Sequence, residues 1–147
     1  MTSYAVTTQV SVSTAADLVR ITPPPGTSLK LLECHVTNDQ FDNQEQLPFA
    51  IYRASTNGGG GSAVTAVPLD PSDPAYLGSV AALLTSIATK EAQLDRQGVP
   101  AAGGYHYMPM KKSRPVIADN RRFVCRLEAA PSTTMELTIT MVVQVNG

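Results

Sequence analysis

The segment "MELTITMVVQV" (residues 135–145) decides the fold class, because its apolar and polar residues alternate with a period of two. A strand with one face in the core and the other in solvent has this period. The segment therefore predicts a long, half-buried β-strand. Its inward row is Met135, Leu137, Ile139, Met141, Val143 and Val145, against outward Glu136, Thr138, Thr140 and Gln144.

Four other segments alternate in the same way: Tyr4–Val12, Leu29–Thr37, Leu47–Ala54 and Arg122–Ala129. Segments rich in proline and glycine separate them, at spacings typical of an all-β sandwich or barrel. The predicted inward residues are Tyr4, Val6, Val10, Val12, Leu32, Cys34, Val36, Leu47, Phe49, Ile51, Phe123, Cys125 and Leu127. The chain length fits one domain over residues 1–147, in which residues 1–14 are either an N-terminal arm or the first strand.

The glycine-rich stretch "STNGGGGSA" (residues 55–63) invites comparison with a phosphate-binding loop. Such a loop needs a preceding strand, a following helix and usually a Lys-Ser or Lys-Thr pair. No lysine follows here, and the next segment, "AVTAVPLDP", has proline and β-branched residues that disfavour a helix. We therefore predict that Gly58–Gly61 is a flexible connection between two strands.

The segment Ala75–Ala92 is ambiguous. Its alanines and leucines suit a short helix, whereas a period of two also fits from Ser79 to Ile87. We favour a strand, preceded by an irregular segment or a single helical turn.

Charge and hydropathy argue against several partners. The formal net charge is −1 and the sequence pI is about 6.1, whereas nucleic-acid-binding domains are usually strongly basic. No apolar run approaches the ~20 residues of a membrane span, and the start lacks the features of a signal peptide. We predict no nucleic-acid partner, no membrane partner and synthesis in a cytoplasm.

Residues suited to catalysis or metal binding are scattered. His35 and His106 form no H-x-H cluster with a carboxylate. Asp70 and Asp73 lie in "LDPSDPAY", where Asp-Pro pairs are typical of turns. No G-x-S-x-G elbow is present. We predict that the protein is not an enzyme and has no catalytic residue, metal site or cofactor.

The two cysteines, Cys34 and Cys125, are far apart in sequence and lie in apolar, strand-like segments. We predict two buried, reduced thiols, in keeping with a reducing cytoplasm. A disulfide between them stays open as an alternative if their strands face each other with Cα atoms within ~7 Å.

Charge is distributed unevenly along the chain. Residues 1–75 contain three basic and seven acidic side chains, whereas residues 76–147 contain eight basic and five acidic ones. A basic segment of this kind predicts contact with an acidic surface, either the 39–45 loop of a neighbouring copy or another protein. The candidate contact residues are Lys111, Lys112, Arg114, Arg121, Arg122, Asp39, Asp42 and Glu45.

The motif "GGYHYMP" (residues 103–109) adds two aromatic residues to this list. In a strand, Tyr105 and Tyr107 share one face, and His106 and Met108 share the other. We interpret the tyrosines as core or subunit-contact residues, with ligand binding as the alternative.

The order of the motifs resembles a known group of proteins. It runs "ITPPPGTSLKLLECHV", "QEQLPFAIYRAST", the glycine stretch, "PLDPSDPA", "GGYHYMP" and "RLEAAPSTTMELTIT". This succession, over residues 15–147, resembles capsid decoration (cement) proteins, which are encoded near the head genes of tailed bacteriophages. "PLDPSDPA" and "RLEAAPSTTMELTIT" carry most of the resemblance.

The resemblance implies a single jelly-roll-like antiparallel β-sandwich. It also implies a structural virion protein that binds the outer capsid surface of a phage head and stabilises it. Its expected partners are the major capsid protein and further copies of itself, in a homotrimer. The alternative function is a carbohydrate- or receptor-binding jelly-roll module of a phage head fibre or tail.

Overall fold

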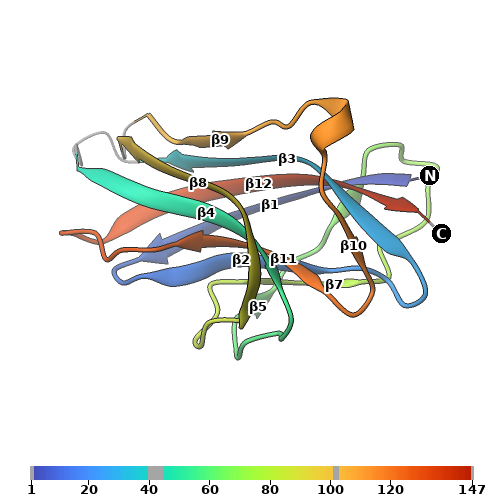
Figure 1. Cartoon of the computed structure of the whole chain (residues 1–147), viewed down its shortest axis with the longest axis horizontal. Coiled ribbons are helices and arrows are strands. Elements are labelled where there is room, and N and C mark those ends of the chain that lie inside the picture. The colour runs from blue at the N-terminus through green and yellow to red at the C-terminus, as the bar shows by residue number, and fades with distance from the viewer. Residues whose placement is uncertain (1, 40–44, 101–102, 147) are drawn as a thin grey trace.

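Strand β12 (Met135–Asn146) lies in the middle of an antiparallel sheet that packs face to face with a second one (Figure 1). The computed structural model describes residues 2–39, 45–100 and 103–146. The predicted all-β sandwich is confirmed. The other elements are β1 Thr2–Val12, β2 Ala16–Thr22, β3 Ser28–Asn38, β4 Gln46–Ala54, β5 Ser62–Ala63, β6 Val67–Pro68, β7 Ser79–Ala82, β8 Lys90–Pro100, β9 Tyr105–Tyr107, the 3₁₀ turn η1 Lys111–Ser113, β10 Val116–Ala118 and β11 Arg122–Leu127.

The early strands pair with the late strands in reverse order. β1 pairs with β12, β2 with β11, β3 with both β9 and β10, and β4 with β8, all antiparallel. This doubled ribbon is distributed over two sheets. Sheet A has the order β10-β3-β12-β1-β6, with β9 also paired to β3, and sheet B has the order β5-β7-β2-β11-β4-β8. An antiparallel ribbon wrapped into two packed sheets is the jelly-roll arrangement.

The core lies between the sheets and follows the predicted inward rows. In β12, the side chains from Met135 to Val143 that face inward are at most 1% exposed. They pack in one cluster with Phe123, Cys125 and Leu127 of β11, which are fully buried. Burial of a large apolar side chain contributes roughly 1.5–3 kcal/mol relative to leaving it in water. These two facing rows therefore contribute a large share of the core, together with buried side chains of β1, β2, β3 and β4.

One predicted inward residue is wrong. β3 bulges opposite β12, where Val142 pairs with Glu33 but Val143 pairs with Leu31. The bulge adds one residue, so Leu31 is fully buried and Leu32 is only half-buried. A bulge of this kind shifts the side-chain alternation by one position. A prediction from an uninterrupted period of two therefore assigns Leu32, instead of Leu31, to the core.

The ambiguous segment contains a strand but no helix. β7 covers Ser79–Ala82, shorter than the predicted Ser79–Ile87. It ends before Leu83, whose φ of 52° lies outside the extended region. The backbone N–H of Leu83 donates to the carbonyl of Leu18 at 2.8 Å, and this bond fixes the turn against β2.

Residues 55–89 form a long excursion between β4 and β8. They reach the far side of the sandwich, where β6 joins the edge of sheet A beside β1, and β7 joins the edge of sheet B beside β2. The return of this segment covers part of the outer face of sheet B, where Ala88 packs with Ala54 and Val124. The excursion therefore ties both sheets together at one side.

The glycine stretch connects β4 to β5, as predicted, and lies at the entrance to this excursion. The backbone N–H of Gly59 donates to the carbonyl of Ser86 at 3.0 Å, and the Thr85 N–H donates to the carbonyl of Gly59 at 2.9 Å. At Gly58, φ is +65° and an added Cβ would lie 2.5 Å from the Ser86 carbonyl oxygen. The glycines thus allow the outgoing and returning segments to approach closely.

Candidate functional site

A charged network occupies the outer face of sheet B. The Asp17 carboxylate is fully buried and accepts hydrogen bonds from Arg126 Nε at 2.5 Å and from the Ala88 backbone N–H at 2.7 Å. Arg126 Nη2 also donates to the Ala88 carbonyl at 2.8 Å. The Arg126 guanidinium carbon lies 4.7 Å from the ring centre of Tyr52. The network binds the return of the 55–89 excursion to sheet B.

The network continues from the Tyr52 ring to the edge strand β8. The Tyr52 hydroxyl donates to Glu128, and burial, together with this hydrogen bond, raises the pKa of Tyr52 to about 12. Glu128 also forms an ion pair with Arg96, 3.3 Å from Nε to Oε1. The Nζ of Lys90 also lies near this tyrosine, 5.0 Å from the centre of the Tyr52 ring. Glu128 and Arg96 are therefore paired within the chain.

Two of the predicted contact residues belong to this face. Arg121 Nε forms an ion pair with Glu91. Arg122 donates to the Asn57 side chain, to the Ser55 carbonyl at 3.3 Å and to the Asn120 carbonyl at 2.9 Å. Both guanidinium groups therefore hold segments of their own chain.

Arg20 reinforces the hold on the excursion. Its Nη1 donates to the Asn57 carbonyl at 2.8 Å. Burial, and then the neighbouring charge of Arg122, lower the pKa of Arg20. Arg20 is not among the contacts predicted from the sequence, although "DLVRIT" contains a lone arginine among apolar residues.

Lys111 and Lys112 lie elsewhere, on the exposed turn η1 beside the edge of sheet A. Neither ammonium group forms an ion pair with another residue in the part of the chain that the structure describes. Arg114 follows them and is half-buried, with its Nε buried away from any hydrogen-bond acceptor among the described residues. Of the predicted basic contacts, Lys111 and Lys112 are therefore the ones available to a partner.

Of the predicted acidic contacts, Asp39 directly follows β3 and Glu45 directly precedes β4. The Asp39 carboxylate accepts hydrogen bonds from Gln9 Nε2 at 2.9 Å and from Thr138 Oγ1 at 2.8 Å. Glu45 accepts one from the Ser132 backbone N–H at 2.6 Å. Asp42 lies outside the described residues. Asp39 and Glu45 thus have bonds within their own chain.

The two tyrosines of β9 have different surroundings. Tyr105 is fully buried, and its hydroxyl donates to Asp95 Oδ2 at 2.5 Å; burial, followed by this bond, raises the pKa of Tyr105. Its side chain packs in the core and is not available to a partner. Tyr107 is half-buried, and burial raises its pKa as well. His106 and Met108 are exposed, which confirms the predicted faces of this strand.

The two histidines meet on the outer face of sheet A. His35 on β3 lies opposite His106 on β9, and their Nδ1 atoms are 2.8 Å apart. The second nitrogen of His35 lies 3.6 Å from a Glu33 carboxylate oxygen. Within residues 2–39, 45–100 and 103–146, no three His, Cys, Asp or Glu side chains gather closely enough to hold a metal ion.

Both cysteines are unpaired and buried, as predicted. Cys34 projects from sheet A and Cys125 from sheet B, and they meet in the core between the sheets. A hydrogen bond between the thiols, and then burial, raise the pKa of Cys34. A thiol that resists ionisation is a poor nucleophile.

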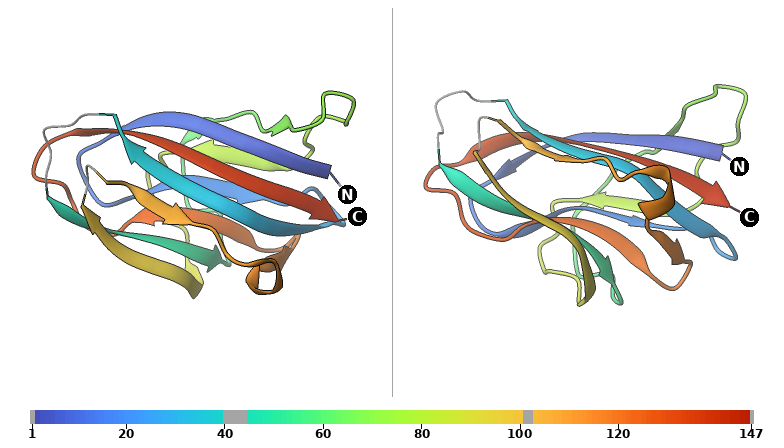
Figure 2. Two further views of the ribbon diagram at one scale, coloured as in Figure 1. Left: turned by 90° about the horizontal axis from the view of Figure 1, so that it is seen from above. Right: turned by 45° about the horizontal axis from the view of Figure 1, so that its top comes forward.

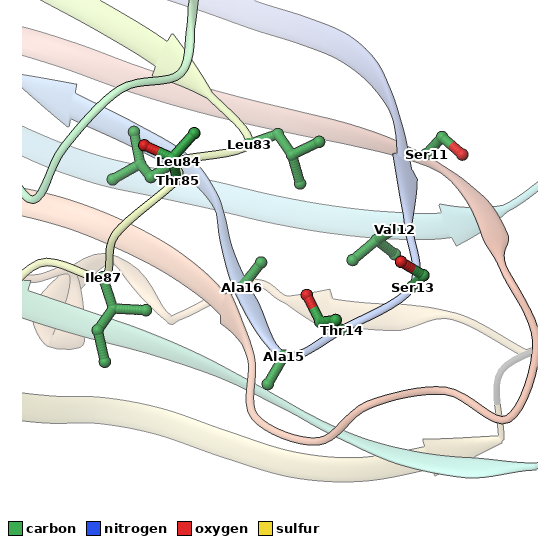
Figure 3. A pocket seen from close by; sticks show the side chains of 10 residues that line it. All are labelled: Ser11, Val12, Ser13, Thr14, Ala15, Ala16, Leu83, Leu84, Thr85 and Ile87. Atoms are coloured by element: carbon green, nitrogen blue, oxygen red, sulfur yellow. The ribbon is translucent and has the colours of Figure 1, made fainter.

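A cavity of about 350 Å³ opens between the β1–β2 turn and the 83–87 segment (Figure 3). Its polar lining consists of serine and threonine residues, and the rest is aliphatic. None of the ten lining residues is aromatic or charged. Ligand sites usually combine aromatic side chains with a few converging polar or charged groups, so this cavity has little with which to orient a ligand. The lining residues are Ser11, Val12, Ser13, Thr14, Ala15, Ala16, Leu83, Leu84, Thr85 and Ile87.

Exposed apolar side chains concentrate in two segments. Residues 67–77 expose Val67, Leu69 and Leu77, and residues 107–116 expose Met108, Met110 and Val116. The only other large apolar side chain that the described structure exposes to this degree is Ile87. Of the exposed residues in these two segments, only Met108 was named from the sequence, where Asp70 and Asp73 were interpreted as turn residues and Lys111, Lys112 and Arg114 as basic contacts. The sequence does contain an indication of this exposure, because in both segments the apolar residues stand among prolines, which do not favour a buried strand.

The described part of the chain contains no helix with the length and hydropathy to cross a bilayer. None of the family models, curated proteins or solved structures with which the chain was compared matches it.

Proposed function

We propose that this protein is a capsid decoration protein of a tailed bacteriophage, which binds the outside of the head and stabilises it as a homotrimer. The proposal rests on the resemblance of the motifs and on one structural observation. The exposed apolar side chains gather on two segments at the margins of a β-sandwich, rather than being scattered. Concentrated apolar surface with a charged surround is typical of protein–protein interfaces.

The rigidity of the sandwich supports a binding role of this kind. Both segments are attached to it: the Leu69 N–H donates to the Ser3 carbonyl at 2.9 Å, and the Leu31 N–H donates to the Pro115 carbonyl at 3.0 Å. Preorganised segments lose little conformational freedom on binding. Three linked copies would also gain from effective concentration, so that modest individual contacts hold neighbouring capsid subunits.

The experiment is to add the purified protein to expanded shells that lack it and to follow thermal disruption of the shells. A ligand that binds only the intact expanded shell raises its melting temperature. We expect co-sedimentation with the shells and a higher melting temperature. Absence of both would reject the proposed function.

The alternative, a carbohydrate- or receptor-binding module, draws support only from the hydroxyl groups around the 350 Å³ cavity. The absence of aromatic and charged side chains from its lining counts against that function. A glycan array separates the two, because the decoration protein is expected to show no sugar preference.

A further inference from the structure

The two apolar segments carry opposite charges. Residues 67–77 contain Asp70 and Asp73 and no basic residue, whereas residues 107–116 contain Lys111, Lys112 and Arg114 and no acidic one. We call the first segment the acidic edge and the second the basic edge. Neither the two aspartates nor the two lysines form an ion pair within the described residues.

The two edges lie on opposite sides of the same sheet. The acidic edge includes β6, at one end of the strand order of sheet A, and the basic edge leads from β9 to β10, at the other end. Figure 2 (left) shows the green 67–77 segment and the orange coil of η1 on either side of the strands β1, β12 and β3. One molecule is therefore unable to bring its own two edges together.

The acidic edge also provides a recess for an apolar side chain. A groove of about 250 Å³ lies beside it, lined mostly by apolar groups that include Tyr4, Pro24, Pro74, Leu77 and Val145. On the basic edge, Met110 is 79% exposed and immediately precedes Lys111. An unbranched thioether side chain adapts well to a groove of irregular shape.

We propose that the acidic edge of one copy binds the basic edge of the next, with Met110 in the groove and Lys111 and Lys112 facing Asp70 and Asp73. This contact joins two different surfaces, so it is heterologous, and its repetition forms a ring when the rotation closes. The inference rests on one part of the proposed function, the association of copies, and does not depend on the capsid. It replaces the 39–45 loop as the acidic partner, because that loop's flanking Asp39 and Glu45 already have bonds within the chain.

The hydrogen bonds of the acidic edge suit this role. Asp70 accepts bonds from the Ser72 N–H at 2.9 Å and from the Ser72 hydroxyl at 2.7 Å, and these bonds lower its pKa. The Tyr4 hydroxyl donates to the Pro74 carbonyl at 3.0 Å and fixes the segment on β1. The carboxylate is thus ionised and presented on an ordered turn.

Charge reversal tests the pairing through the molecular mass in solution, measured by light scattering. The variant Asp70→Lys/Asp73→Lys has two basic edges, and Lys111→Glu/Lys112→Glu has two acidic edges. Each alone should be monomeric, whereas an equimolar mixture should form assemblies in which the two variants alternate, because each edge then meets its opposite. A three-membered ring cannot alternate two variants, so the fourfold variant Asp70→Lys/Asp73→Lys/Lys111→Glu/Lys112→Glu, in which both edges are exchanged, should restore the closed ring on its own. Failure of the mixture to associate, with both variants folded by circular dichroism, would overturn the proposal, as would a wild-type chain that is monomeric at every concentration.

The apolar part is tested by Met110→Ser and Leu77→Ser, whose side chains are 79% and 78% exposed and support no core packing. We expect unchanged thermal stability of the monomer and a dissociation constant that is about 30-fold weaker, the usual effect of losing an interface anchor. The control Glu136→Lys changes the charge of a residue in the middle of sheet A and should leave the mass unchanged. A mass equally sensitive to this control would also reject the proposed contact.

Failure of the edge-to-edge contact and failure of the proposed capsid role give different results. A chain that associates through these edges but leaves shells unaffected supports the interface and rejects the capsid role. A chain that stabilises shells as a monomer rejects the interface and retains the capsid role.

Discussion

The outer faces of the two sheets are built in different ways. On sheet B, the fully buried Asp17 carboxylate and its partner Arg126 lie beneath the 83–89 segment. On sheet A, Figure 2 (left) shows central strands that no described segment crosses. Their outward side chains contact side chains of the neighbouring strand, as in the 3.5 Å contact between the hydroxyls of Thr7 on β1 and Thr140 on β12. Sheet B therefore holds a covering segment through buried polar contacts, whereas we expect the central strands of sheet A to tolerate changes on their outer face.

The largest expected difference between the faces comes from Arg126→Met. The change leaves the Asp17 carboxylate buried without its cation, which typically costs about 3–5 kcal/mol. Urea denaturation should show this loss in the free energy of unfolding. The double variant Asp17→Leu/Arg126→Met removes both charges and should recover most of it. A loss below about 1 kcal/mol in the single variant would show that the pair contributes little to covering sheet B.

A second test concerns the close approach of the excursion to itself. Gly58→Ala places a Cβ 2.5 Å from the Ser86 carbonyl oxygen at a φ of +65°, whereas Gly26→Ala has a φ of +75° and no atom within 4 Å. Both variants should lose the roughly 1–2 kcal/mol that a left-handed conformation costs a residue with a Cβ. Gly58→Ala should lose more, by an amount that reports on packing alone. Equal unfolding free energies in the two variants would contradict this explanation.

The third test uses pH. The folded-state pKa of Tyr52 is about 12, above the ordinary value of 10, so folding favours the protonated phenol. Its contribution to stability is complete below the unfolded-state pKa and is lost as the pH rises through the folded-state value. Wild-type protein should lose more stability than Tyr52→Phe between about pH 9 and about pH 12. Identical pH dependence in the two proteins would exclude a role for this hydroxyl. Because Tyr52→Phe retains all the other tyrosines, their titration affects both proteins equally.

The smallest expected effect is on sheet A. Thr140→Ala removes a half-buried hydroxyl whose side-chain contact is with Thr7 at 3.5 Å. The unfolding free energy should change by no more than about 0.5 kcal/mol, as for most surface positions. Differential scanning calorimetry can measure this against wild type. A larger loss would mean that the outer face of sheet A is also held by specific contacts.

The same difference between the faces explains which elements the sequence predicts. β12 and β1 have one buried and one accessible face, so their residues alternate: β12 was predicted as a strand, and residues 1–14 as either an N-terminal arm or the first strand. β2 was not, because Ala16, Asp17, Leu18 and Val19 are all buried and the period of two disappears. β8 was missed for the opposite reason: it is an edge strand without a fully buried residue.

The candidate contacts show a similar limit. The sequence indicated that residues 111–126 are basic but not which cations have partners. Arg121 and Arg122 are bound to Glu91 and to residues 55–57, which are distant in sequence and become neighbours only through the excursion. Lys111 and Lys112 are on the turn η1, which has no buried residue and is closed by a hydrogen bond from the Ser113 N–H to the Met110 carbonyl. Pairing across long sequence separations depends on topology, which side-chain periodicity does not specify.

The pairing of the first strand with the last has a consequence for biogenesis. β1 is matched along its whole length to β12, from Thr2 opposite Val145 to Val12 opposite Met135. During synthesis, the first strand therefore waits for its main partner until nearly all of the intervening chain has left the ribosome. Folds dominated by such distant pairings form slowly, on the order of milliseconds to seconds, and expose apolar strands meanwhile. We expect the yield of soluble protein to depend on translation rate and on chaperones more than its final stability would suggest.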